Sequence, residues 1–128
     1  MIVPFAPGGS TDLVGRLIAE YVGRELGQSI VVENKGGAGG AVGAEHIARS
    51  VPDGYTVGMA TVSTHGSNPA IYKNLKYDPV KDFAPISNVM GIPSVFAVNP
   101  KVPAKDMKEF IALAKADPMK YSFASPGV

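Results

Sequence analysis

The sequence predicts an α/β fold built around a parallel sheet. Three short apolar segments, residues 1–5, 29–33 and 55–60, alternate with two segments of helical periodicity, residues 10–26 and 41–50. A strand–helix–strand–helix–strand order of this kind forms a parallel sheet with right-handed crossovers. With 128 residues, of which 45% are hydrophobic and 18% charged, the chain is long enough for one hydrophobic core.

The first strand and the first helix are bounded by clear local signals. Strand 1–5 runs into a Pro-Gly-Gly turn, and Ser10 or Thr11 is suited to cap the helix that follows. Asp12 favours the positive end of the helix dipole, and Gly27 ends the helix. The apolar residues of this helix recur with a period near 3.6 and predict one apolar face: Leu13, Val14, Leu17, Ile18, Tyr21 and Val22.

The second strand and helix are joined by a glycine-rich loop. Strand 29–33 contains three consecutive β-branched residues, so we expect both of its faces to be covered. The loop at residues 35–43 leads into helix 41–50. This helix is expected to bury Val42, Ile47 and Ala48.

The rest of the chain is less regular. A polar loop at residues 61–68 follows the third strand, and residues 69–72 predict one helical turn. Residues 84–90 and 94–98 are strand-like. Two further elements are a helix and a last strand, predicted at 104–116 and 121–124. The sequence then ends at Ser125-Pro-Gly-Val128, which looks like the opening of another strand–turn–helix unit, so we predict a fragment whose uncovered edges and apolar faces favour self-association.

Composition excludes several classes of function. Lys and Arg number 12 against 11 Asp and Glu, without clustering, so neither nucleic acid nor an anionic membrane is an expected partner. Cysteine is absent, which excludes disulfides, thiolate zinc sites and a cysteine nucleophile. The sequence has no apolar run near the roughly 20 residues that a membrane-spanning helix needs.

Three loops are expected to meet at one edge of the sheet. They are residues 7–12, 61–68 and 125–127, and each follows the carboxyl end of a predicted strand, where open α/β sheets bind ligands. All three are rich in hydroxyl groups and glycine and lack Lys and Arg. The first also begins a helix, whose leading N–H groups have no partner within the helix and favour an anion. The sequence therefore predicts a site for a small carboxylate held by neutral donors.

Enzymatic alternatives rest on weaker patterns. The glycine-rich loop follows a strand and opens a helix, as in dinucleotide-binding enzymes, but its glycine spacing departs from that fingerprint. Ser10 with His65 is the pair that a small hydrolase would use, although the sequence offers no orienting third residue. His46 and His65 lack the spacing of metal ligands, so neither a metal nor another cofactor is expected.

Several blocks of the sequence resemble the tripartite tricarboxylate transporter receptors, also called the Bug family of solute-binding proteins. The blocks run through essentially the whole chain: Ile2-Val-Pro-Phe-Ala-Pro-Gly-Gly-Ser-Thr-Asp12, Val32-Glu-Asn-Lys-Gly-Gly-Ala-Gly-Gly40, Pro52-Asp-Gly-Tyr-Thr56, Asn68-Pro-Ala-Ile-Tyr72, Tyr77-Asp-Pro-Val-Lys-Asp-Phe83, Val98-Asn-Pro100 and Ser125-Pro-Gly127. Family members are much longer, so the chain resembles roughly their first two-fifths.

The resemblance implies a two-lobed receptor of the periplasmic binding protein type II kind, which closes around a small carboxylate and has no catalytic activity. It implies export to the periplasm by a signal peptide that this sequence does not contain, and delivery of the ligand to membrane permease subunits. Residues 1–98 would form an incomplete first lobe and residues 99–128 the beginning of a second lobe. Which ligand is bound does not follow from the sequence.

The resemblance also assigns ligand-binding residues. The loop after the first strand would contribute Phe5, Gly9, Ser10, Thr11 and Asp12. The loop after the third strand would contribute Thr61, Ser63, Thr64, His65 and Asn68. Ser125 and Gly127 would contribute from the second lobe, where Pro126 departs from the small residue that is common in the family and removes one N–H donor.

Overall fold

The computed structural model describes residues 1–93 and 95–122. The described residues form two compact units, residues 1–85 and residues 86–122, and each is treated by itself below. Within the described residues, no helix combines the length and the apolar character that a bilayer crossing requires. The predicted lobe boundary after residue 98 concerns a complete two-lobed protein and stays a prediction.

A small parallel sheet forms the centre of the first unit. β1 (Ile2–Val3) pairs with β2 (Glu33–Asn34), with Ile2 opposite Glu33 and Val3 opposite Asn34. On its other side, Ile2 bridges in parallel to Gly58. The predicted α/β fold with a parallel sheet is therefore confirmed.

The strands are shorter than the sequence predicts. Ile2 bonds through its N–H group and its carbonyl to residues 57 and 59, and Pro4, two residues further on, has no N–H group, so the ladder on this side cannot continue. The third predicted strand is correspondingly a single bridge at Gly58, and the second strand is two residues long. Because a ladder is only as long as its shorter partner, the sheet ends early and the loops begin close to its centre.

α1 (Ser10–Leu26) agrees with the predicted helix at both ends, and Gly27 ends it in the left-handed conformation at φ 63°. Its inward face consists of Asp12, Gly15 and Ala19. A Cβ atom on Gly15 would lie 2.9 Å from the Val3 side chain, so the helix approaches the sheet through its small residues.

The predicted apolar face of α1 is only partly used. Leu13, Leu17 and Tyr21 are 61%, 52% and 59% exposed. These three residues lie four positions apart and form a stripe on the opposite side of the helix from its small residues. Much of the periodic apolar face therefore lies away from the sheet, because the close approach uses the glycine and alanine side of the helix.

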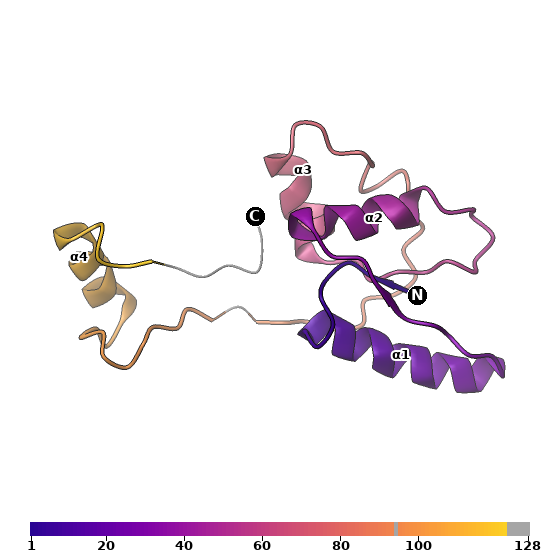
Figure 1. The fold of residues 1–128 in the computed structure, drawn as a ribbon, viewed down its shortest axis with the longest axis horizontal. Helices are drawn as coiled ribbons and strands as arrows, with labels where there is room; N and C mark the ends of the chain where they lie inside the picture. Colours follow the sequence, from indigo (N-terminus) through magenta and orange to yellow (C-terminus); the bar gives the residue numbers. More distant parts are fainter. Residues whose placement is uncertain (94, 123–128) are drawn as a thin grey trace. The chain divides into compact units, whose positions relative to one another are not determined.

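The other side of the sheet is covered by α2 (Ala41–Ala48), which a 3-10 turn, η1 (Ala38–Gly40), precedes. Figure 1 shows α1 on one side of the strands and α2 with α3 on the other. α2 ends two residues earlier than predicted, and Val42, expected to be buried, is 50% exposed. A Cβ atom on Gly43 would lie 2.7 Å from the Pro4 Cα atom, so the glycine is what lets α2 reach the sheet.

The polar loop after the third strand is helical. η2 (Ser63–Ser67) is a π-helical turn that continues into α3 (Asn68–Ile71). The predicted helical turn at 69–72 is thus confirmed within one residue, whereas the expected open loop before it is wound into a turn.

The second unit contains α4 (Met107–Ala116), whose cap, Asp106, accepts a hydrogen bond from the Glu109 N–H at 2.8 Å. The ring centroids of Phe96 and Phe110 lie 5.0 Å apart, and those of Phe110 and Tyr121 lie 5.7 Å apart. The described residues between 84 and 122 form no strand, contrary to prediction, because no neighbouring segment pairs with them. Residues 94 and 123–124 of the predicted strands lie outside the described residues.

Candidate functional site

Three loops meet at the carboxyl end of the sheet in the first unit. A Cβ atom placed on Gly40 would lie 2.7 Å from the Thr64 methyl group and 3.1 Å from the Phe5 ring. The Asn68 side chain also donates to the Gly39 carbonyl oxygen at 3.0 Å. The loop after β1, the glycine loop and the η2 turn are therefore in direct contact, as parallel strands require.

A buried carboxylate organises the first of these loops. Asp12 is 2% exposed, and its Oδ2 accepts hydrogen bonds from the Gly8 N–H at 2.8 Å and from Arg16 Nε at 3.0 Å. Its Oδ1 accepts from Asn34 Nδ2 at 2.8 Å. These bonds, that to Arg16 above all, hold the pKa of Asp12 at about 2, below its ordinary value of 3.8. The carboxylate is thus charged, and protein donors occupy both of its oxygens.

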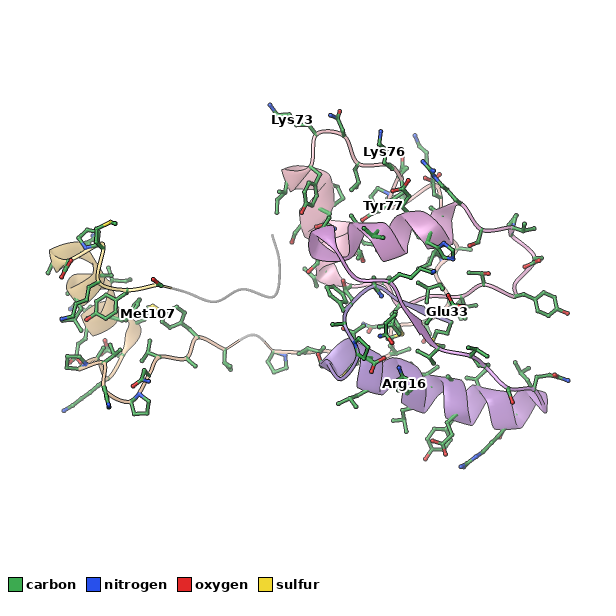
Figure 2. All side chains as sticks on the ribbon, viewed as in Figure 1. Arg16, Glu33, Lys73, Lys76, Tyr77 and Met107 are labelled. Atoms are coloured by element: carbon green, nitrogen blue, oxygen red, sulfur yellow. The ribbon has the colours of Figure 1, made fainter. Side chains whose placement is uncertain are left out.

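Asn34 ties the second strand to the same loop. Its Nδ2 donates to the Phe5 carbonyl oxygen at 3.0 Å as well as to Asp12, and its Oδ1 accepts from Arg16 Nη2 at 3.0 Å. Figure 2 shows Arg16 on the side of α1 that faces the strands. Sequence analysis did not select Asn34 or Arg16, although the position of Asn34 at the carboxyl end of the second strand was a usable signal.

The beginning of α1 offers free donors. The first hydrogen bond of the helix runs from the Leu13 N–H to the Gly9 carbonyl at 3.0 Å, and the cap, Gly9, has no side chain to serve the preceding N–H groups. Among the described residues, the N–H groups of Ser10, Thr11 and Asp12 have no partner. Ser10 and Gly9 are exposed and Thr11 is half-buried. Unpaired N–H groups and the helix dipole together favour an anion at this point.

The threonines of the η2 turn are occupied within the turn itself. Thr64 is fully buried, and its Oγ1 accepts from the Thr61 N–H at 2.9 Å and donates to the Thr61 carbonyl at 3.1 Å. The Thr61 hydroxyl oxygen in turn accepts from the Thr64 N–H at 3.3 Å. These two hydroxyls hold the turn together, whereas the half-buried Ser63 has no side-chain partner among the described residues.

The rings of His65, Tyr77 and Phe83 form an aromatic cluster at the η2 turn. The His65 ring lies 4.6 Å from the Phe83 ring and 6.3 Å from the Tyr77 ring, centroid to centroid. His65 Nδ1 is 2.8 Å from the Thr64 hydroxyl, and burial lowers the pKa of the imidazole below its ordinary value. His65 is therefore neutral at neutral pH, and its ring nitrogen takes part in the bonding of the turn.

Asn68, the last predicted contact of this loop, is 2% exposed. Its amide donates to the glycine loop, and its side chain also hydrogen-bonds to Tyr77. Asn68 thus links the glycine loop to the segment that contains Tyr77.

The glycine loop serves packing. Gly37, Gly39 and Gly40 have φ values of 125°, 59° and 86°, in the region that favours glycine. Gly40 sits against Thr64 and Phe5, so the loop lies beneath the other two loops and does not present an open phosphate cradle. The loop therefore serves the packing of the helix against the sheet, and the dinucleotide alternative is left without support. No cluster of three His, Cys, Asp or Glu suited to a metal occurs among the described residues.

The structure therefore brings the first two groups of predicted site residues to one end of the sheet. Gly9, Ser10 and Thr11 lie at the free N–H groups, and Phe5 and the η2 turn both meet the glycine loop at Gly40. The carboxylate of Asp12 is turned inward, so only its N–H group faces the site. Ser125 and Gly127 lie outside the described residues.

The sequence model of the tripartite tricarboxylate transporter family receptor matches residues 14–128. Protein BugT of Bordetella pertussis is 38% identical over 125 residues, which are 97% of this chain. The chain spans about two fifths of the length of the curated relatives it matches, 38% in the case of BugT.

Solved structures agree with the sequence comparison. A structure titled as that of a periplasmic transporter is 55% identical, with a TM-score of 0.83, over 98% of this chain and 42% of that chain. MatC (Rpa3494) from Rhodopseudomonas palustris with bound malate is 39% identical, with a TM-score of 0.83, over 90% of this chain and 40% of that one. R. palustris Rpa4515 with adipate is 33% identical, with a TM-score of 0.83, over 91% and 39%. With a family match from residue 14 to residue 128 and these structural neighbours, the chain belongs to the tripartite tricarboxylate transporter receptor family.

Proposed function

We propose that this chain provides the first lobe and the start of the second lobe of a periplasmic solute-binding receptor for a small carboxylate. Residues 1–98 are assigned to the first lobe and residues 99–128 to the second. The receptor carries its ligand to the permease subunits of a tripartite transporter, performs no catalysis and needs no cofactor.

One observation carries this proposal. At the carboxyl end of the sheet, the N–H groups of Ser10, Thr11 and Asp12 are unpaired among the described residues, and hydroxyl groups of Ser10 and Thr11 lie beside them. These donors are uncharged and belong to a long helix whose dipole favours a negative ligand. Several such hydrogen bonds compensate a carboxylate when no cation is present.

The relatives support the choice of ligand class. MatC was solved with malate and Rpa4515 with adipate, and both of these molecules are dicarboxylates. Because the two molecules differ in length and in their hydroxyl group, what they share is the carboxylate. We therefore assign the carboxylate to the N-terminus of α1, with Phe5, Gly9 and Ser63 at its border and Ser125 and Gly127 contributing from the second lobe.

Calorimetric titration with mono-, di- and tricarboxylates, using the protein at its full encoded length, tests the proposal. Saturable binding of one of them supports it, and the absence of binding throughout the series contradicts it.

A backbone variant then locates the site. Gly9 has φ −74° and ψ 166°, an extended conformation that tolerates a following proline, and proline is favoured at the first helical position.

Ser10→Pro therefore removes one N–H donor without disturbing the helix, and Ser10→Ala, which keeps that N–H, is the matched control. A hydrogen bond to a charged group contributes about 1.5–3 kcal/mol. The proline variant should consequently bind about tenfold to a hundredfold more weakly than the alanine variant. Equal affinities of the two variants would remove the Ser10 N–H from the site.

A further inference from the structure

We infer that Asp12, Arg16 and Asn34 form a positioning network for the carboxylate site: they fix the loop between Phe5 and Asp12, and Arg16 cancels the charge that Asp12 places beside the site. This inference rests on the proposed function, because it assigns roles to residues that need not touch the ligand. It gives the Asp12 side chain a different role from that of a ligand contact, while the Asp12 N–H group stays among the proposed donors.

The network fastens the loop at both of its ends. At the beginning, Asn34 Nδ2 holds the Phe5 carbonyl oxygen at 3.0 Å. Near the end, Asp12 Oδ2 holds the Gly8 N–H at 2.8 Å. Asn34 and Asp12 are themselves joined at 2.8 Å, so the two fastenings form one unit anchored on the second strand. The loop that precedes α1 is thereby held in place, and with it the unpaired N–H groups of Ser10, Thr11 and Asp12.

Charge is the second part of the argument. Asp12 lies in the first turn of α1, beside the N–H donors that would receive an anion. A carboxylate there repels a negatively charged ligand unless a positive charge compensates it. Arg16 Nε provides that charge at 3.0 Å, and the Asp12 side chain is only 3% exposed. The pair is therefore close to neutral when the ligand approaches.

Asn34 cannot be replaced by its isosteres. Its amide donates to Phe5 and Asp12 and accepts from Arg16 Nη2 at 3.0 Å, so both of its ends are in use. An aspartate at this position would lose the donors, and a leucine would lose every bond. The network thus needs one acid, one amide and one guanidinium, all three being present on neighbouring elements.

Double substitution separates charge cancellation from a purely structural role. With malate and adipate as probes, Arg16→Gln should weaken binding about tenfold at low salt, and added salt should recover part of the loss by screening Asp12. Adding Asp12→Asn to Arg16→Gln should restore part of the affinity, because the uncompensated charge is gone. Arg24→Gln, which breaks the comparable pair of α1 with Glu20, is the matched control and should leave the affinity unchanged.

Unchanged affinity in Arg16→Gln would overturn the inference. So would a double variant that binds no better than Arg16→Gln, because that result marks simple damage to the fold. Failure of the unsubstituted protein to bind any carboxylate is a different outcome, which contradicts the proposed function.

A ligand-free measurement tests the positioning role in every case. Amide hydrogen exchange of Gly8 reports the bond to Asp12. We expect Asn34→Ala to speed this exchange about tenfold, with little change at the core residue Val3. Exchange at Gly8 that does not change, or that rises together with exchange at Val3, would overturn the positioning role.

Discussion

The Tyr77 hydroxyl donates a hydrogen bond of 2.6 Å to the carbonyl oxygen of Thr64, thirteen residues earlier in the chain. This bond fastens the η2 turn to the segment that follows α3. Burial raises the pKa of Tyr77 above its ordinary value, so the hydroxyl keeps its proton and remains a donor. The position of the turn over the glycine loop thus depends on a side chain that was not among the predicted site residues.

Tyr77→Phe should destabilise the protein through loss of this bond. Because the Thr64 carbonyl would be left without a donor in a buried place, we expect a cost of about 1–3 kcal/mol in the free energy of unfolding, measured with urea. Tyr55 is 91% exposed, so Tyr55→Phe is the matched control and should change stability by less than about 0.5 kcal/mol. Equal effects of the two substitutions would show that the bond carries no net stability.

Gly40→Ala tests the contact among the three loops. The added Cβ atom meets Thr64 at 2.7 Å and Phe5 at 3.1 Å, at a residue whose φ is +86°. Gly54 has nearly the same φ, +83°, but nothing lies within 4 Å of its added Cβ, so Gly54→Ala carries the backbone strain alone.

That strain costs about 1–2 kcal/mol, and overpacking should add about 1–3 kcal/mol at Gly40. Unfolding by urea gives both values. A smaller cost at Gly40 than at Gly54 would mean that the loops separate without penalty.

Asp12 should make the stability of the first unit depend on pH in a defined range. Its pKa is lowered in the folded protein, from 3.8 to about 2, so its stabilising contribution is complete above pH 3.8 and is lost as the pH falls through 2. We therefore expect the folded protein to lose stability between these values. Asp12→Asn should reduce stability at neutral pH and flatten the acid limb of the curve. Parallel curves for the two proteins would exclude this role.

The exposed stripe of α1 should cause the chain to self-associate. Leu13, Leu17 and Tyr21 are each more than half exposed and lie on one side of the helix. Sedimentation velocity of the 128-residue chain should show oligomers that Leu17→Lys disperses. Val51, which is 70% exposed but lies outside α1, supplies the control substitution Val51→Lys. If both lysine variants behave like the unsubstituted chain, association uses another surface, such as a sheet edge.

Much of the fold follows from local signals in the sequence. The ends of α1 were predictable because Gly27 and the Pro-Gly-Gly turn act on the residues beside them. The strands were overestimated because their length depends on pairing, and Pro4 stops the ladder from within the predicted strand. The face of α1 that meets the sheet was not predictable, because periodicity shows that a helix has faces but not which of them is packed.

The sequence was sufficient to predict which loops meet at the candidate site, but not the hydrogen bonds that hold them there. Strand order alone places the loops after the first and third strands at one edge. The part that escaped prediction is made of contacts between distant residues, such as Asn34 with Phe5 and Tyr77 with Thr64. A polar side chain can bond to many partners, and only the folded chain determines which of them it meets. The inward orientation of the Asp12 side chain could not be predicted for the same reason.

The self-contained bonding of the η2 turn has a consequence for redesign. Thr61 and Thr64 satisfy each other, so the shape of the turn does not depend on the residue at position 63. Under the proposed function, ligand preference and the integrity of the turn are thereby uncoupled at this position. Position 63 is accordingly the natural place to diversify in a library that aims to turn the proposed receptor into a sensor for other metabolites.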